Sequence, residues 1–158
     1  MDKPKEQDII EKFLANISYY IHLDGEHYEI FREVGLGKKF RWFPPCGEHK
    51  SPMLVVEPKR RCDLMILTEK SVWLIEAKRQ LNCEAVGQVL LYRYLFIREC
   101  VRQEGNKIYA DIFVNGDLVS LDVAGKDVKI GIIYGESDED LEGLCEELGV
   151  HTILVKHL

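Results

Sequence analysis

The stretch "CDLMILTEKSVWLIEAK", residues 62–78, decides the fold. It predicts two strands, 62–67 and 72–77, because two apolar runs flank the polar residues Thr68, Glu69, Lys70 and Ser71. Both strands are apolar on both faces, which is typical of strands in the interior of a sheet. The segment therefore predicts a buried hairpin at the centre of the sheet.

Two carboxylates are expected to meet at the open end of this hairpin. If Leu67 faces Val72 across the four-residue connection, the antiparallel register places Asp63 opposite Glu76. Facing residues on one side of a sheet have Cβ atoms about 4.5–5.5 Å apart. Lys78 lies on the same face as Glu76, because side chains alternate along a strand. Like charges in this position are unfavourable unless a cation neutralises them or one carboxyl is protonated.

A divalent cation would resolve this repulsion. Hard cations such as Mg²⁺ prefer oxygen ligands, so we expect Asp63, Glu76 and the carbonyl of Ala77 to bind Mg²⁺ or Mn²⁺. Such an ion polarises a phosphate and lowers the pKa of a bound water, while Lys78 orients or deprotonates that water. The competing interpretation is a surface ion pair between Glu76 and Lys78, worth roughly 0–1 kcal/mol.

The rest of the chain predicts helices and strands around this hairpin. Hydrophobic periodicity, capping residues and an Asn-Gly turn indicate their places. Helices are expected at 5–22, 83 to about 101 and 138–149, strands at 28–34, 129–135 and 151–157, and a second hairpin at 108–123. Residues 38–52, which contain Pro44-Pro45, predict an irregular basic loop. The expected fold is α/β, one domain over residues 1–158 with a mixed central sheet flanked by helices.

Composition indicates a water-soluble protein. The 158 residues are 46% hydrophobic and 30% charged, and no apolar run approaches the roughly 18 residues that a membrane helix needs. The charged N-terminus lacks a secretory signal, so we expect no membrane association and a cytoplasmic location. The five cysteines are odd in number and widely spaced, which favours reduced thiols over disulfides. Cys46 and His49 have no second metal-binding pair of matching spacing, so a loop is the better interpretation there.

Charge is unevenly distributed along the chain, whose formal net charge is −6. Residues 35–62 carry seven Lys and Arg against two Glu, whereas residues 135–149 carry seven acids and no base. Such asymmetry allows a phosphate-binding face on an acidic protein, although a basic segment can also be simply a solvated surface. The residues expected to contact a nucleic acid are Lys38, Lys39, Arg41, Lys59, Arg60, Arg61 and Arg79.

The order of these acids and the lysine resembles the PD-(D/E)xK nuclease superfamily. Asp63, Glu76 and Lys78 supply the pattern of one acid, a second acid, any residue and lysine. The following helix contains "GQVLLY", in which Gln88 and Tyr92 are similar to the QxxxY motif of the RecB-like branch. The resemblance implies a restriction-endonuclease-like core, helix, three strands, helix, strand, with an added hairpin and a C-terminal helix and strand.

The resemblance also implies an activity, the metal-dependent hydrolysis of DNA phosphodiester bonds. Asp63 and Glu76 would bind the ion, Lys78 would act on the water, and Gln88 with Tyr92 would contact DNA or steady the site. The family often adds an acid from the first helix, for which Glu11 is the candidate and Glu6, Asp8 and Glu33 are competitors.

The sequence departs from the family pattern at two points, and it leaves other functions open. Cys62 replaces the nominal proline before Asp63, and only Cys145 lies near the C-terminus, so no iron–sulfur cluster is expected. The alternative function is a nucleic-acid-binding or assembly protein that keeps the fold without cleaving. A purely structural interaction module would leave the Asp63–Glu76 juxtaposition unexplained. A homodimer is possible through the first helix or the 108–123 hairpin.

Overall fold

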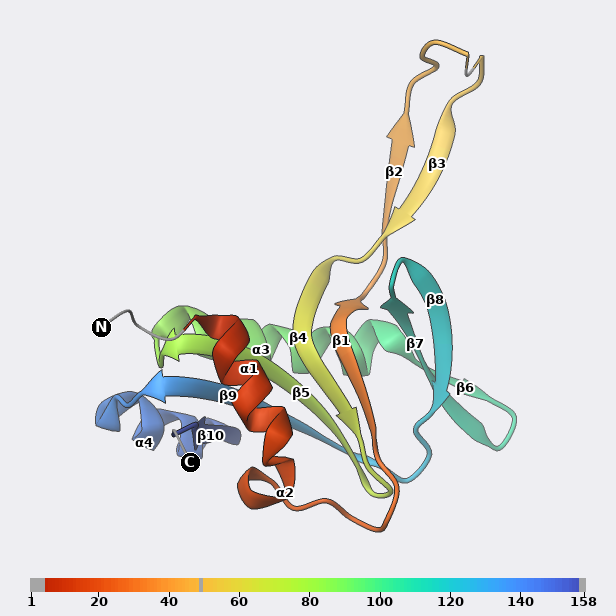
Figure 1. The fold of residues 1–158 in the computed structure, drawn as a ribbon. Helices are drawn as coiled ribbons and strands as arrows, with labels where there is room; N and C mark the ends of the chain where they lie inside the picture. Colours follow the sequence, from red (N-terminus) through yellow and green to blue (C-terminus); the bar gives the residue numbers. More distant parts are fainter. Residues whose placement is uncertain (1–4, 49, 157–158) are drawn as a thin grey trace.

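The predicted hairpin lies in the interior of an eight-stranded sheet. In the computed structural model, which describes residues 5–48 and 50–156, β4 (Arg60–Leu67) is joined to β5 (Ser71–Gln80) by a short turn (Figure 1). The strand order is β10-β9-β5-β4-β1-β7-β6, with β8 beside β7. The predicted register is confirmed from Leu67 opposite Val72 to Leu64 opposite Ile75.

The sheet is mixed, as predicted. Strand β5 runs parallel to β9, and β9 runs parallel to β10, whereas the other pairs are antiparallel. The bounds of the remaining sheet strands are β1 Glu29–Leu36, β6 Val101–Glu104, β7 Lys107–Val114, β8 Asp117–Asp122, β9 Asp127–Glu136 and β10 Val150–Leu154.

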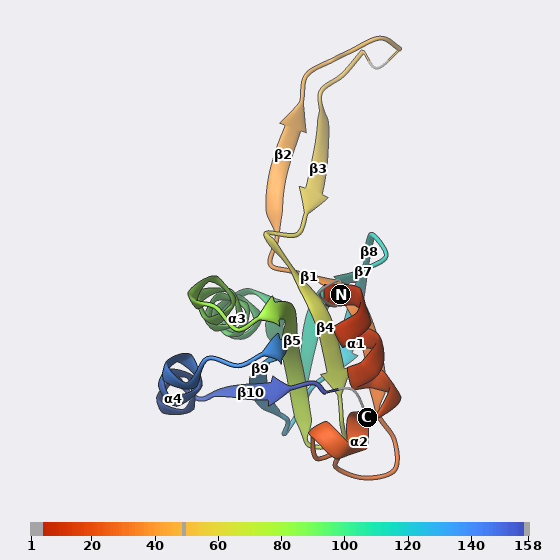
Figure 2. The same ribbon diagram turned by 60° about the vertical axis from the view of Figure 1, so that its left-hand side comes forward.

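Helices cover both faces of the sheet (Figure 2). Helices α1 (Glu6–Ala15) and α2 (Ile17–Tyr20) lie on one face, where Phe13 packs with Trp73 and Ile75. Helices α3 (Cys83–Leu95) and α4 (Glu139–Leu148) lie on the other. The larger of the two hydrophobic cores is on this second face and contains Leu74 and Val89. The protein is therefore an α/β protein whose central sheet separates two cores.

Two predicted helices are interrupted. The helix predicted at 5–22 breaks at Asn16, which separates α1 from α2. The helix predicted from 83 to about 101 begins as expected, since Asn82 Oδ1 accepts a hydrogen bond from the Ala85 backbone N–H at 2.8 Å. It ends at Leu95 and continues as a π-helical turn, η1 (Phe96–Cys100), which leads directly into the unpredicted strand β6.

The other local signals are confirmed. Asn115 and Gly116, with φ values of 52° and 84°, form the turn between β7 and β8, in which both residues need the left-handed backbone region. Asp138 Oδ1 accepts a hydrogen bond from the Leu141 backbone N–H at the start of α4. Gly149 ends that helix with φ 72°.

The prediction of an irregular loop at 38–52 is wrong for residues 39–43, which form a strand. Strands β2 (Lys39–Phe43) and β3 (Met53–Glu57) pair into a separate two-stranded hairpin, which we call the arm (residues 39–57). The arm projects away from the sheet in both ribbon views (Figures 1 and 2). Pro44 and Pro45 do not prevent regular structure, because they lie just beyond the end of β2, where no ladder hydrogen bond is needed. Cys46 is exposed near the tip, and His49 lies outside the described residues.

Within the part of the chain that the structure describes, no helix is both long and apolar enough to cross a membrane.

Candidate active site

The candidate site lies where β4 separates from β5. The backbone ladder between them ends at Leu64 and Ile75, and the next pair of this register would be Asp63 with Glu76. Side chains occupy that position instead. Asp63 Oδ2 accepts a hydrogen bond from the Ala77 backbone N–H at 2.8 Å, and Cys62 Sγ lies 3.4 Å from the Ile75 carbonyl oxygen. The two strands thus open around the Asp63 carboxylate.

A reversal of side-chain direction accompanies this opening. Cys62 packs in the α3-side core, but Leu64, two residues later, packs in the α1-side core. Residues two apart on a regular strand share a face, so the pleat is interrupted between them, as in a β-bulge. The sequence predicted that Asp63 and Glu76 face each other as a regular pair. The structure shows no such pair, because the ladder ends at Leu64 and Ile75. The Asp63 carboxylate reaches the gap between the strands, and Asp63 also lines a cavity of about 450 Å³ beside α1.

Cys62, which directly precedes Asp63, has a structural role in this opening. Its Sγ lies 3.0 Å from the carbonyl oxygen of Leu64, in addition to its contact with Ile75. Burial is the main cause that raises the pKa of the thiol, so Cys62 stays protonated and can donate a hydrogen bond. Its thiol thus contacts the backbone carbonyls of Leu64 and Ile75, the last regular pair of the β4–β5 ladder.

Glu76 is buried beside Asp63, with 6% of its surface exposed. Burial raises its pKa to about 8, and hydrogen bonding to Asp63 and the charge of Asp63 act in the same direction. The Tyr92 hydroxyl donates a 2.6 Å hydrogen bond to Glu76 Oε2, and this bond and the charge of Lys78 oppose the shift. The structure thus brings Asp63, Glu76, Lys78 and Tyr92 together, with a buried carboxyl that holds a proton near neutral pH.

The predicted QxxxY pair lies on the helix that covers this site. Tyr92 is buried, and its hydroxyl also lies 2.8 Å from the carbonyl oxygen of Arg61, so it links α3 to both strands. Gln88 is one helical turn earlier on the same face of α3. Its Oε1 atom is buried without a hydrogen-bond partner among the described residues. Tyr92 steadies the carboxyl site, whereas Gln88 retains an unused acceptor.

Glu11 is not among the acids that line the cavity with Asp63. Glu11 is an exposed residue whose Oε1 atom pairs with Arg32 Nη2 at 2.9 Å, and this hydrogen bond lowers its pKa. Glu6 and Glu33 instead line the same cavity as Asp63. Glu33 has a left-handed backbone, with φ 50°, although it is neither glycine nor asparagine. Such strain is concentrated at functional sites.

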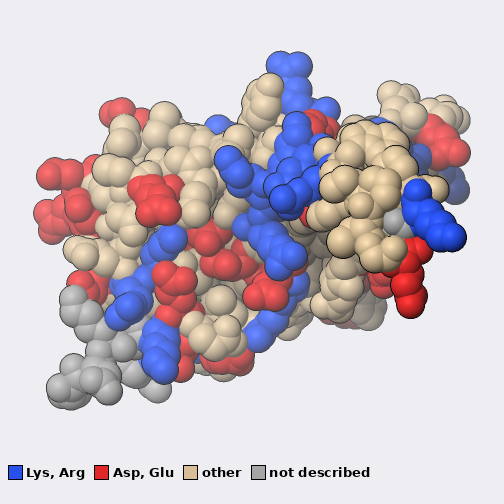
Figure 3. All heavy atoms as spheres, turned by 90° about the horizontal axis from the view of Figure 1, so that it is seen from above, with Lys and Arg blue, Asp and Glu red and all other residues tan. Residues whose placement is uncertain are grey.

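The basic residues expected to bind nucleic acid divide into two groups. Lys39, Lys59, Arg60 and Arg61 line a groove of about 510 Å³ at the base of the arm. Figure 3, which views the molecule from the side of the arm, shows Lys and Arg side chains gathered near the middle of this face. Several are paired with acids, since Lys59 Nζ lies 2.7 Å from Glu99 Oε1 and Lys39 Nζ lies 3.7 Å from Glu57 Oε2.

The remaining members of that set are not part of the groove lining. Arg41 is exposed on the arm, with its guanidinium 5.3 Å from the ring centre of Phe43. Lys38 is half-buried at the base of the arm, and Arg79 is exposed near the end of β5. Arg61 connects the groove to the carboxyl site, because its carbonyl oxygen receives the Tyr92 contact and Asp63 follows it by two residues.

The donor chemistry of the site fits a hard divalent cation. Asp63 and Glu76 place two carboxylates close enough to disturb the ionisation of Glu76, and a bound cation would stabilise both in their charged forms. The residues that would hold it are Asp63, Glu76 and the carbonyl of Ala77. Among the described residues no group of three or more His, Cys, Asp or Glu side chains is arranged to hold a metal, so water and phosphate oxygens would complete the ligand set.

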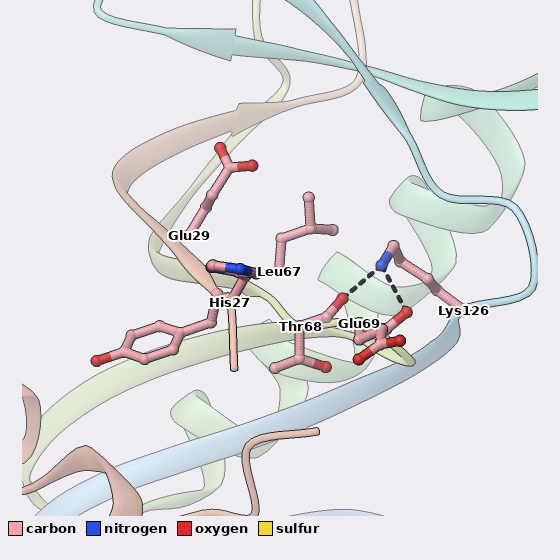
Figure 4. A pocket seen from close by; sticks show the side chains of 7 residues that line it. His27, Glu29, Leu67, Thr68, Glu69 and Lys126 are labelled. Atoms are coloured by element: carbon pink, nitrogen blue, oxygen red, sulfur yellow. Dashed lines mark hydrogen bonds between the residues drawn. The ribbon is translucent and has the colours of Figure 1, made fainter. Parts of the chain in front are cut away.

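A second hollow, at the other end of the hairpin, has a structural explanation. It surrounds the turn between β4 and β5, where Thr68 and Glu69 lie opposite His27 (Figure 4). The Lys126 ammonium donates hydrogen bonds to the backbone carbonyls of Thr68 and Glu69, the latter at 2.7 Å. The lysine thus satisfies two carbonyls of the turn, and this end of the hairpin is remote from Asp63.

Some contributors to the site were not evident from the sequence. The thiol of Cys62 and the carbonyl of Arg61 have no motif, because their roles depend on the gap between β4 and β5. The arm had a detectable signal. "KFRWF" and "MLVVE" are short β-prone runs on either side of a segment rich in proline and glycine, which is typical of a hairpin.

Comparisons with protein-family models, with curated proteins and with solved structures found no match for this chain.

Proposed function

We propose that this protein is a Mg²⁺- or Mn²⁺-dependent nuclease that hydrolyses DNA phosphodiester bonds, on a restriction-endonuclease-like core. The observation that carries the proposal is the convergence of Asp63, Glu76, Lys78 and Tyr92 at the opening between β4 and β5. A buried carboxyl with a raised pKa beside a second carboxylate is costly to a fold, and the most direct use of such a pair is to bind a cation.

Each side chain has a role in this proposal. Asp63 and Glu76 hold the ion, and the Tyr92 hydroxyl orients Glu76 through its 2.6 Å hydrogen bond. A bound divalent ion would supply Lewis acidity toward a phosphate oxygen and a water molecule. The Lys78 ammonium, whose charge acts on Glu76, orients that water and offsets negative charge on the phosphate. The oxygen of water is added to phosphorus, and the bond from phosphorus to the leaving oxygen breaks.

The test is a cleavage assay on linear, circular, single-stranded and branched DNA, with Mg²⁺, Mn²⁺ or EDTA. We expect metal-dependent cleavage that Asp63→Ala, Glu76→Ala and Lys78→Ala each reduce by at least about 100-fold. Glu69→Gln and Lys70→Ala are the matched controls, because these exposed residues lie at the other end of the same hairpin. Full activity in a folded Glu76→Ala variant would exclude this site.

The alternative is a protein that binds nucleic acid without cleaving it. The basic groove at the base of the arm favours this second function, because phosphate binding by its Lys and Arg side chains does not require the carboxyl pair. Salt-sensitive DNA binding without cleavage in either metal would support it.

A further inference from the structure

The arm presents an exposed face made only of apolar side chains. In the β2–β3 pairing, Phe40 lies opposite Val56 and Trp42 lies opposite Leu54, so these four residues share one face, which we call the apolar arm face. Their exposed fractions are 65% for Phe40, 66% for Trp42, 47% for Leu54 and 40% for Val56. No described residue from 39 to 57 belongs to either hydrophobic core.

The exposed apolar face of this isolated hairpin indicates that another molecule covers it. A two-stranded hairpin is only marginally stable in water, and the exposure of its aromatic side chains to solvent does not add to its stability. The arm projects beyond the rest of the molecule, so the described chain does not cover this face (Figures 1 and 2). The occupant of the apolar arm face is therefore a different molecule or a second copy.

The charge of the surroundings favours a nucleic acid. The arm and its flanks, residues 38–61, carry seven Lys and Arg against two Glu, on a chain whose formal net charge is −6. Lys39 and Arg41 project from the opposite face of β2, with Glu57 as their shared acidic neighbour. Basic residues alternating with aromatic rings match the phosphates and bases of a single strand.

The extent of the apolar arm face argues against a second copy. From the exposed fractions of its four side chains, the solvent-accessible area of the apolar arm face is roughly 400–500 Å² per arm. Two arms packed face to face would bury about 800–1,000 Å², which is below the roughly 1,200 Å² of a stable interface.

We propose that the apolar arm face binds unpaired bases of a single-stranded segment of nucleic acid, with Phe40 and Trp42 as stacking platforms. The two rings are two residues apart on one strand, roughly 6.6–6.8 Å. This spacing is about twice the 3.4 Å rise between stacked bases, so one base fits between the rings. This inference rests on the proposed function, which identifies DNA as the molecule bound. It narrows the substrate to DNA with a single-stranded segment.

The apolar arm face leads toward the carboxyl site. Val56 lines a hollow of about 290 Å³ at the base of the arm, together with Glu33 and Arg61. Glu33 also lines the cavity that contains Asp63. The two hollows share Glu33, so they adjoin between the base of the arm and the cavity that contains Asp63.

The experiment uses Trp42 as its own reporter. The chain has two tryptophans, and Trp73 is only 4% exposed, so quenching by an added oligonucleotide reports on Trp42. A dT oligonucleotide is titrated into the full chain in EDTA, which prevents cleavage, and the affinity is measured independently by fluorescence anisotropy of a labelled copy. We expect quenching on binding. Phe40→Ala and Trp42→Ala should each weaken binding on the order of 10-fold.

Phe43→Ala is the matched control, because Phe43 is an aromatic residue of the same strand on the opposite face. It should change the affinity by less than about 2-fold, and a blunt duplex should bind all variants alike, since stacking needs unpaired bases. Equal effects of Trp42→Ala and Phe43→Ala, or binding without quenching, would overturn the proposal. So would a wild-type dimer, seen by sedimentation, that Trp42→Ala dissociates while oligonucleotide binding is unchanged.

The two proposals fail in different ways. Oligonucleotide binding that depends on Trp42, without cleavage in Mg²⁺ or Mn²⁺, would reject the nuclease and keep the arm inference. Cleavage that depends on Glu76, with binding that is indifferent to Trp42, would reject the arm inference and keep the nuclease.

Discussion

At the scale of single residues, Glu76 decides the chemistry of the candidate site. Burial and the neighbouring Asp63 raise the pKa of its carboxyl to about 8, although the hydrogen bond from Tyr92 acts in the opposite direction. In the unfolded chain the same carboxyl has a pKa of about 4.3. The folded protein therefore binds an additional proton between these two values, and its free energy of unfolding depends on pH in that range.

The first prediction concerns this pH dependence. Because the folded state holds the proton more tightly, the metal-free protein should lose stability as pH rises from about 4.3 to about 8. Glu76→Gln should remove much of this loss and raise the Tm at pH 8.5 by at least roughly 2–4 °C, the shift that 1 kcal/mol produces in a domain of this size. Thermal unfolding in EDTA from pH 5 to pH 9 measures both effects. Identical pH profiles for the two proteins would contradict the assignment.

The second prediction concerns Tyr92. Its hydroxyl donates to Glu76 and lowers the pKa of that carboxyl, so Tyr92→Phe should raise the pKa further. Since a metal binds the ionised carboxylate, Mn²⁺ affinity at pH 7 should fall on the order of 10-fold. Isothermal titration calorimetry measures the affinity, and Tyr94→Phe, at an exposed residue of the same helix, is the control. Unchanged affinity in Tyr92→Phe would show that Glu76 does not bind the ion.

At the scale of secondary-structure elements, the site depends on irregularities in two neighbouring strands. Strand β4 interrupts its pleat at Asp63, and β1 has the left-handed Glu33 between the paired residues Arg32 and Val34. In the β1–β4 register Glu33 lies opposite Asp63, and neither forms a regular pair there. The two irregular positions thus coincide across adjacent strands, and they open the cavity that both acids line.

The third prediction tests the strain at Glu33. A left-handed backbone costs a residue with a side chain roughly 1–2 kcal/mol, a cost that glycine avoids. Glu33→Gly should therefore raise the free energy of unfolding by about 1 kcal/mol, whereas Glu29→Gly, at an exposed position of the same strand without a positive φ, should lower it. Urea denaturation measures both. A Glu33→Gly variant that is as destabilised as the control would refute the strained conformation.

At the scale of the whole molecule, the arm and the α/β body are separate in their packing. The two cores lie on the two faces of the sheet, and the described arm residues belong to neither. The base of the arm is held by local contacts, including a 3.0 Å hydrogen bond from the Lys59 backbone N–H to the Leu36 carbonyl oxygen. The body should therefore fold without the arm.

The fourth prediction follows from this separation. Replacing residues 40–56 with Asn-Gly should leave cooperative unfolding intact and change the Tm by less than roughly 4 °C, because the deletion removes almost no buried apolar surface. Circular dichroism during thermal unfolding measures the effect. A matched deletion of the β7–β8 turn, residues 115–116, should be more damaging, since the adjoining strands carry core residues such as Ile112. Loss of cooperative unfolding in the arm deletion would show that the arm supports the body.

Much of the body was predictable because its signals are local. The β4–β5 hairpin, the Asn82 cap, the Asn115-Gly116 turn and the Gly149 end of α4 each depend on a few adjacent residues. The arm was missed because the prolines at 44 and 45 were taken to affect the whole segment, when they affect only the end of β2. The break at Asn16 and the π-helical turn at Phe96–Cys100 had no comparable local signal.

By itself, the sequence determined the α/β class, the central hairpin and the approach of Asp63, Glu76 and Lys78, because two apolar runs and the length of the loop between them specify the strand register. Only the tertiary structure decided how Asp63 enters the gap between strands, which acids share its cavity, and that Tyr92 contacts Glu76. These features arise from contacts between residues far apart in the chain, on three strands and two helices. Their positions depend on how the whole sheet packs, and no local pattern encodes that.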